Sequence, residues 1–214
     1  MYHTRKIMKY YYASKQDRVN AVYEKDGKYY PVFKERYGSE GFVPSEPLEE
    51  ITDKESVMSL NKYMNPYEEG KIKIYMAGPL FNEGDRYTNQ INSDKLRELG
   101  YSTFLPQEIV ITNNSSKLVK DGCFYMDLKA ISICDYLVVN CNGMDIDSGT
   151  AAEIGLGYGL NKKMILYKSD VRNYYNDTYR LNNFVGGLVD NKVCHTLDEV
   201  IECLKQGEQY GNFK

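Results

Sequence analysis

Hydrophobic and polar positions follow two different patterns along this chain of 214 residues, and the pattern changes near residue 70. Before that point, residues 19–24 and 28–33 alternate around Lys25-Asp26-Gly27. This alternation predicts a β-hairpin with Asp-Gly at its turn. Pro31 would place the second strand at the edge of a sheet, because proline has no N–H group to donate.

After Lys71, apolar runs typical of strands alternate with stretches typical of helices. The predicted strands are residues 72–77, 101–105, 136–140 and 163–167, with 192–195 as a fifth candidate. The predicted helices are residues 83–99, 120–133, 149–160 and 197–205. Such alternation predicts an α/β fold with a doubly wound parallel sheet of four or five strands.

Two of these segments have informative patterns. Residues 136–140 are the most apolar strand, which is typical of a strand buried on both faces of a parallel sheet. Residues 83–99 show the spacing of an amphipathic helix and are followed by Gly100 as a stop signal. The apolar residues on one side of this helix are Tyr87, Ile91, Leu96 and Leu99.

Composition supports a division into two domains. Residues 1–70 are rich in tyrosine and charge and form a small N-terminal domain, whereas residues 71–214 form the α/β domain. In the first, residues 38–47 are a predicted loop and residues 48–63 a predicted short helix. Lys and Arg dominate residues 1–36, whereas Asp and Glu dominate residues 37–70. We expect these halves to attract each other; a basic patch that binds phosphates is the alternative.

Bulk properties exclude several classes of function. The net charge of −3 gives no global electrostatic reason to bind a nucleic acid polymer. No apolar run is long enough to span a bilayer, and the N-terminus lacks the pattern of a signal peptide, so we expect a cytoplasmic protein without membrane contact. The five cysteines form no C-x-x-C pair and are expected to be reduced and mostly buried: Cys123, Cys134, Cys141, Cys194 and Cys203.

Only two histidines are present, which argues against a histidine metal site or triad and leaves acid–base chemistry to carboxylates. The string Asp147-Ser-Gly-Thr-Ala-Ala-Glu153-Ile-Gly155 follows the most apolar strand and opens a helix of small residues. It places two carboxylates near a helix N-terminus at the carboxyl edge of the sheet, where open α/β sheets bind ligands. The alternative is that Asp147 or Ser148 is an ordinary N-cap and Glu153 a solvated helix residue.

Four separated motifs together resemble the nucleoside 2-deoxyribosyltransferases. They are Ile74-Tyr75-Met-Ala-Gly78-Pro-Leu-Phe81, Tyr125-Met-Asp127-Leu, the string from Asp147 to Gly155, and Asn182. The resemblance covers about residues 72–205 and implies a flavodoxin-like fold. It also implies exchange of the base on a 2′-deoxynucleoside, and it gives no role to residues 1–70.

The resemblance assigns three catalytic roles. It makes Glu153 the nucleophile that forms a deoxyribosyl ester, Asp127 the acid–base group facing the nucleobase, and Tyr75 the residue that hydrogen-bonds and orients Glu153. The physical chemistry agrees: cleavage of an N-glycosidic bond needs a carboxylate beside the anomeric carbon and a proton for the departing base. Each of two residues also has an alternative role: Asp127 as an ordinary surface acid of a helix, and Tyr75 as a core residue at the end of the sheet.

Five further residues are expected to bind substrate. The resemblance implies that Asp147 holds a sugar hydroxyl, Gly78 admits the ligand to the backbone, Phe81 stacks on the base and Asn182 reaches the 5′-hydroxyl, often from a neighbouring subunit. Gln107 lies after the second strand at the same sheet edge and would read base edges. Phe81 has an alternative role in packing under a loop.

The expected function is therefore transfer of deoxyribose between nucleobases, with a nucleoside and a nucleobase as partners and with no metal or organic cofactor. The family implies a homo-oligomer, a dimer or larger, with shared active sites. One alternative is hydrolysis of 2′-deoxynucleoside 5′-monophosphates, with Ser148 and Thr150 at the helix start as phosphate ligands. Another is a non-catalytic nucleotide sensor.

Overall fold

The structure, a computed structural model, describes residues 8–109, 111–172, 181–190 and 192–207. The chain forms two compact units, each described here by itself. One, the N-terminal unit, comprises residues 1–66 and 109–129; the other, the α/β unit, comprises residues 67–108 and 130–214. Helix α4 (Lys117–Ile133) has residues in both. Within the described part of the chain, no helix has the length and apolar character needed to cross a membrane.

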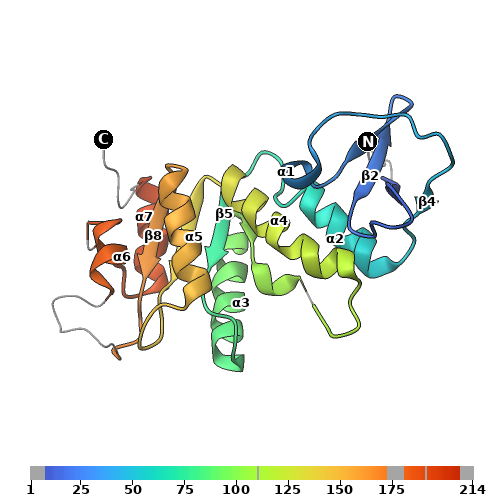
Figure 1. Ribbon diagram of the computed structural model, residues 1–214. Helices are drawn as coiled ribbons and strands as arrows, with labels where there is room; N and C mark the ends of the chain where they lie inside the picture. The colour runs from blue at the N-terminus through green and yellow to red at the C-terminus, as the bar shows by residue number, and fades with distance from the viewer. Residues whose placement is uncertain (1–7, 110, 173–180, 191, 208–214) are drawn as a thin grey trace. The chain divides into compact units, whose positions relative to one another are not determined.

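A parallel sheet forms the centre of the α/β unit (Figure 1). Its strands are β5 (Lys73–Ala77), β6 (Ser102–Phe104), β7 (Tyr136–Asn140) and β8 (Lys163–Tyr167), in the order β6-β5-β7-β8. This is the order of flavodoxin-like folds, in which the second strand lies on one side of the first and the third and fourth strands lie on the other. The predicted parallel sheet is confirmed, with four strands among the described residues. The fifth candidate contributes a single parallel bridge between Cys194 and Tyr167.

Helices flank this sheet and bury its apolar side chains. They include α3 (Glu83–Glu98), α5 (Ser148–Gly159), α6 (Asn183–Gly187) and α7 (Leu197–Gln206), with a 3-10 turn, η1 (Pro106–Glu108), after β6. All five residues of β7 are buried, as predicted for a strand covered on both faces. Gly157 lets α5 approach β7 closely, because an added Cβ would lie 2.8 Å from Leu137 Cδ2.

The sequence pattern did not identify the buried side of α3. Leu96 is buried, but the other three apolar residues of the predicted stripe are exposed: Tyr87 at 68%, Ile91 at 47% and Leu99 at 44%. The side that faces the sheet is polar instead, and its buried residues besides Leu96 are Asn89, Asn92 and Ser93. Burial of these groups is tolerated because each finds a hydrogen-bond partner on the sheet side.

Those partners are strand and loop groups of the α/β unit. Asn92 donates its side-chain amide to Tyr167 Oη at 2.5 Å, and the hydroxyls of Ser93 and Thr103 lie 2.6 Å apart. Burial raises the pKa of Tyr167 well above its ordinary value, so that its hydroxyl stays protonated. The orientation of α3 is therefore set by directional contacts.

The N-terminal unit contains an antiparallel sheet in the order β3-β2-β1-β4. Its strands are β1 (Tyr10–Tyr12), β2 (Ala21–Lys25), β3 (Lys28–Pro31) and β4 (Glu49–Glu50). The predicted hairpin is confirmed: β2 and β3 pair around Asp26 and Gly27, whose φ angles of 53° and 75° suit an Asp-Gly turn. As predicted from Pro31, β3 lies at the edge of the sheet.

Helices α1 (Lys34–Tyr37) and α2 (Lys54–Met64) also belong to this unit. The predicted helix over residues 48–63 starts later than expected, because β4 pairs with β1 and Asp53 then caps α2 by accepting from Ser56 N at 2.8 Å. The expected attraction between the two halves is present. Lys9 pairs with Glu50 and Arg18 with Glu49, at 3.0 and 2.7 Å.

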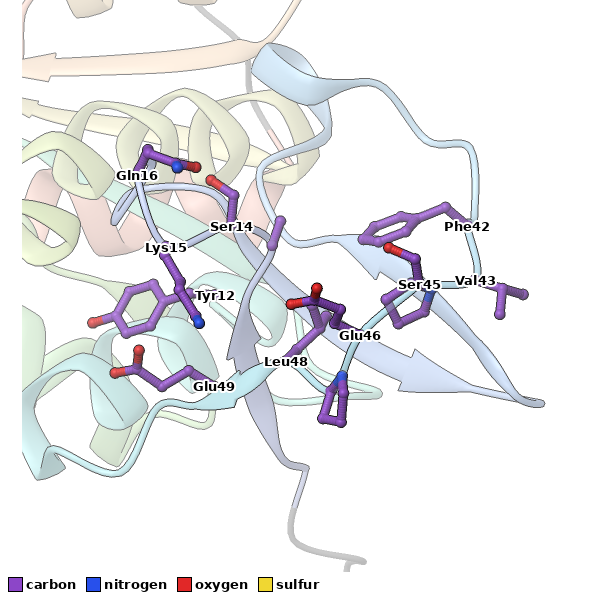
Figure 2. Close-up of a pocket in the computed structure, with 13 residues that line it drawn as sticks. Tyr12, Ser14, Lys15, Gln16, Phe42, Val43, Ser45, Glu46, Leu48 and Glu49 are labelled. Carbon is purple, nitrogen blue, oxygen red and sulfur yellow. The ribbon is translucent and has the colours of Figure 1, made fainter.

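A groove of about 510 Å³ lies on the N-terminal unit, lined by residues 12–16 and 42–49 (Figure 2). Lys15 from the first of these segments and Glu46 and Glu49 from the second give its lining both signs of charge. The groove therefore selects no ligand class by charge alone.

Candidate active site

Tyr75 and Glu153 meet at the carboxyl edge of the parallel sheet. The Tyr75 hydroxyl donates to Glu153 Oε1 at 2.5 Å. The ring of Tyr75 is fully buried and stacks on Phe104 of β6, with centroids 5.6 Å apart. Because neighbouring strands fix the ring, the hydroxyl reaches Glu153 from a rigid element. The hydrogen bond expected from the sequence is present, and the catalytic roles of both residues stay predictions.

Asp147 is the N-cap of α5. Its Oδ1 accepts from the backbone N–H groups of Gly149 and Thr150 at 3.0 and 3.2 Å, and the Thr150 hydroxyl donates to Oδ2. These contacts satisfy amides that have no partner inside the helix, and the negative charge suits the helix N-terminus. Asp147 is therefore a structural cap, and its expected contact with a sugar hydroxyl stays a prediction.

Gly78, after β5, is explained by packing against β7. An added Cβ would lie 2.8 Å from Asn140 Cβ, a clash that no rotamer of Asn140 removes. The expectation that Gly78 admits a ligand to the backbone is a separate matter and stays a prediction.

Two buried asparagines join the loops at this edge, and the sequence reading missed both. Asn140, the last residue of β7, donates to Asn89 Oδ1 at 2.8 Å and accepts from Asn142 N at 3.0 Å. Asn89 in turn donates to the carbonyl of Pro79 at 2.7 Å. An asparagine that ends a fully buried strand is the sequence feature that would have pointed to this network.

Three further predicted substrate ligands belong to the α/β unit. Phe81 is 75% exposed. Asn182 is exposed and caps α6 by accepting from Phe184 N at 2.9 Å. Gln107 donates its side-chain amide to the Arg86 carbonyl at 2.7 Å, which ties η1 to α3. The roles predicted for these residues in binding a base or sugar stay predictions.

Asp127 lies on α4 within the N-terminal unit. The Cys123 thiol, one helical turn earlier, lies 3.8 Å from Asp127 Oδ2. Burial, with the nearby Asp127 charge, raises the pKa of Cys123 to about 12, so this thiol stays protonated near neutral pH. The relation of Asp127 to Glu153 stays a prediction, because the two residues belong to different compact units.

The five cysteines are thiols rather than disulfides, and Cys134, Cys141, Cys194 and Cys203 are buried, as predicted. Burial raises the pKa of Cys134 and Cys141 to about 12. Among the described residues, no three His, Cys, Asp or Glu side chains are arranged to hold a metal ion.

Comparison with known families agrees with this geometry. The family model described as nucleoside 2-deoxyribosyltransferase matches residues 74–204, which include β5 to β8, the Tyr75–Glu153 pair and the Asp147 cap. The chain belongs to the nucleoside 2-deoxyribosyltransferase family. It is therefore an enzyme of the kind that transfers or hydrolyses glycosyl groups.

Several solved structures are similar to this nucleoside 2-deoxyribosyltransferase family member. One is a conserved protein from Enterococcus faecalis V583, with 26% identity and a TM-score of 0.56. The match covers 65% of this chain and 100% of that one. A 2-deoxyribosyltransferase from Bacillus psychrosaccharolyticus has 24% identity and a TM-score of 0.50, covering 66% and 99% of the two chains, and shares the fold. A 2-deoxyribosyltransferase from Leishmania mexicana has 17% identity and a TM-score of 0.46 over 63% and 97%. None of the curated protein sequences matches this chain.

Proposed function

We propose that this family member is a nucleoside 2-deoxyribosyltransferase that moves 2-deoxyribose from one nucleobase to another through a covalent ester on Glu153. The hydrogen bond of 2.5 Å between Tyr75 and Glu153 is the observation that carries the proposal. It holds a carboxylate in a fixed orientation at the edge where open α/β sheets bind ligands. A solvated surface glutamate would have no need of a fully buried tyrosine as its partner.

The proposed reaction has two displacements at C1′ of the sugar. In the first, a carboxylate oxygen of Glu153 bonds to C1′ while the N-glycosidic bond breaks and its electron pair leaves with the base. Asp127 is the proposed group that gives the departing base a proton. In the second, a nitrogen of the incoming base attacks C1′, the ester bond breaks, and Glu153 is released as a carboxylate while Asp127 recovers the proton.

The Asp147 cap favours an unphosphorylated nucleoside. A phosphate would bind at a helix N-terminus through free backbone N–H groups. At α5, however, the N–H groups of Gly149 and Thr150 and the hydroxyl of Thr150 already donate to Asp147. A fixed carboxylate there repels a phosphate but can accept a hydrogen bond from a sugar hydroxyl. This supports the nucleoside over the 5′-monophosphate.

The exposed apolar residues of α3 support the proposed assembly. Tyr87 and Ile91 lie one turn apart, with 68% and 47% of their surfaces exposed. Aromatic and aliphatic groups on one helix face are typical of surfaces covered by another subunit. We therefore include in the proposal that copies of the chain associate and that Asn182 of one copy serves the site of another.

The decisive experiment mixes the protein with deoxyinosine and free adenine and separates the products by liquid chromatography. A transferase gives deoxyadenosine and hypoxanthine, and the Glu153→Ala variant gives neither. Release of free base and sugar phosphate from a 2′-deoxynucleoside 5′-monophosphate, without deoxyadenosine, would instead support the nucleotide hydrolase. Binding without any cleavage would support the sensor. Mass spectrometry after mixing with a 2-fluoro-2-deoxy nucleoside should place the sugar on the peptide that contains Glu153.

A further inference from the structure

A lysine is buried at the end of the last strand of the parallel sheet. Lys168 directly follows β8 and is only 1% exposed. Its ammonium donates to the carbonyl of Cys141 at 3.2 Å and to the carbonyl of Gly143. Both carbonyls belong to the loop that leads from β7 to α5. Lysine is rarely fully buried, so these contacts must offset a large loss of hydration.

The same loop is held at several other points by residues next to Lys168. Asp170 Oδ2 accepts from the N–H group of Gly143 at 3.2 Å. Both the N–H group and the carbonyl of Gly143 are therefore hydrogen-bonded to residues that follow β8. The side-chain oxygen of Asn142 accepts from the N–H groups of Ser169 and Asp170, each at 2.9 Å. We call residues 168–170 the β8 clamp. It fixes the backbone of residues 141–143 from a neighbouring strand.

Gly143 has an unusual backbone conformation within this loop. Its φ of 117° lies in a region that side-chain-bearing residues rarely adopt. A carbonyl on such a turn has no strand partner, and an ammonium is a strong donor for it. The Lys168 contact therefore stabilises a backbone conformation that the loop would otherwise leave easily.

The ammonium is compensated only in part. Burial lowers the pKa of Lys168, whereas the charges of Asp170 and Asp145 raise it and that of Arg172 lowers it. Among the described residues, no carboxylate forms an ion pair with Lys168. A methionine of similar length would fill this space without the cost of desolvation. What a lysine adds is its hydrogen bonds to the loop carbonyls.

Those carbonyls lie shortly before two residues of the proposed site, Asp147 and Glu153. Asp147 follows Gly143 by four residues, caps α5, and is followed after six more by Glu153. From Asp147 onward the chain is helical and packs on β7 through Gly157. The conformation of residues 141–143 therefore helps to decide where α5 starts, and with it where Glu153 meets Tyr75.

We propose that Lys168 is a positioning residue for glycosyl transfer, which holds the β7–α5 loop so that Asp147 and Glu153 are in place before substrate binds. This inference rests on the proposed function for its kinetic consequence, and on the geometry of the β8 clamp for its structural one.

The test compares Lys168→Ala with a matched control, Lys162→Ala. Lys162 also donates to two backbone carbonyls, those of Ser132 and Cys134 at 2.6 and 3.0 Å, but it precedes β8 and so lies at the opposite end of the sheet. Misplacement of a catalytic group by 1 Å costs about 100-fold in rate. We expect Lys168→Ala to lower kcat by about that factor at a nearly unchanged KM for deoxyinosine, and Lys162→Ala to keep kcat near that of the wild type.

Two readouts separate positioning from a loss of folding. Propylammonium replaces the atoms that Lys168→Ala removes, so it should restore much of kcat, whereas 1-propanol should not. If Lys168→Ala does not fold, Lys168→Met keeps the packing volume and removes only the donor, and it should show the same loss of kcat. Unchanged kcat in a folded Lys168 variant would overturn the proposal, as would equal losses in the Lys162 control.

Amide hydrogen exchange tests the clamp independently of activity. Exchange in residues 142–151 should be faster in Lys168→Met than in the wild type, and it should be unchanged in Lys162→Ala. If the wild type shows no transfer from deoxyinosine, the proposed function fails while this comparison still decides whether Lys168 holds the loop. If the wild type is active and exchange in residues 142–151 is unchanged, only the inference about Lys168 fails.

Discussion

Tyr75 and Glu153 are 78 positions apart in the sequence, and a single hydrogen bond of 2.5 Å joins them. One residue lies in the first strand of the parallel sheet and the other on the helix after the third. The contact exists because β5 and β7 are direct neighbours and α5 packs back on β7. The order of the strands therefore creates the pair on which the proposed chemistry depends.

Removal of the Tyr75 hydroxyl should slow the reaction without unfolding the protein. Tyr75→Phe keeps the ring stacked on Phe104 and removes the hydroxyl that bonds to Glu153. Hydrogen bonds to charged groups contribute about 1.5–3 kcal/mol, so we expect kcat to fall by about 10- to 100-fold. Tyr67→Phe is the matched control, because Tyr67 also lies against Phe104 and donates to the carbonyl of Ala130 at 3.0 Å. Equal effects of the two variants would contradict the role of Tyr75.

Asp147 should control whether a 5′-phosphate is tolerated. Asp147→Ser keeps a side chain able to cap α5 but removes the negative charge. We expect the ratio of kcat/KM for deoxyinosine 5′-monophosphate to that for deoxyinosine to rise at least about 10-fold, a change of 1.4 kcal/mol in selectivity. Steady-state kinetics with both substrates measures this ratio. A ratio that does not change would show that Asp147 does not face the 5′ end of the sugar.

The packing of α5 on the sheet can be tested with two glycines of the same helix. Gly157→Ala would bring a Cβ to 2.8 Å from Leu137, whereas Gly155 has no atom within 4 Å of an added Cβ. Overpacking costs about 1–3 kcal/mol, and alanine in an open helical position gains up to about 1 kcal/mol over glycine. Urea denaturation should therefore show opposite changes in the free energy of unfolding. Destabilisation of similar size in both variants would contradict the packing described for α5.

The buried ammonium of Lys168 should make stability depend on pH in the alkaline range. Its pKa is lowered in the folded protein, so between that pKa and the ordinary 10.5 the unfolded chain binds more protons than the folded one. The free energy of unfolding therefore rises with pH through this window. The cost of the buried charge is fully present below the folded pKa and is gone above 10.5.

Lys168→Met lacks this cost at every pH, so its stability relative to the wild type should be greatest near neutral pH and decline towards pH 10.5. Urea denaturation of both proteins at several pH values measures the difference. Asp170 and Arg172 keep their charges over this window, because their hydrogen bonds to each other lower the pKa of Asp170 and raise that of Arg172. Burial raises the pKa of Cys141 to about 12, so its thiol stays neutral. A difference that does not vary with pH would contradict a lowered pKa of Lys168.

Several features could be predicted from the sequence because each rests on a local rule. The Asp-Gly hairpin and the four parallel strands follow from turn chemistry and strand periodicity. Helix capping gave the Asp147 cap only as the alternative to a role in binding substrate. The contact between Tyr75 and Glu153 required the family resemblance, since no local rule links residues so far apart.

Other features depend on tertiary contacts that a pattern does not contain. Periodicity finds an apolar stripe on α3 but cannot tell whether the sheet or another surface covers it, and here the sheet covers Asn89, Asn92 and Ser93. In the sequence, Lys168 resembles an ordinary polar residue after a strand. Only the structure shows that it is buried and that it donates to carbonyls of the β7–α5 loop. Likewise, the early start predicted for the second helix ignored the pairing of β4 with β1.

The amides of Asn89 and Asn92 have a consequence for how the substrate is received. Apolar contacts have no preferred direction, so they allow a helix to slide or roll by small amounts. The hydrogen bonds of side-chain amides form only within a narrow range of angles. Asn89 is hydrogen-bonded both to Pro79, in the loop after β5, and to Asn140, at the end of β7, so rolling of α3 would break both bonds at once. The loop after β5 and the end of β7 are thus fixed before the proposed nucleoside binds, and little ordering entropy remains to be lost on binding.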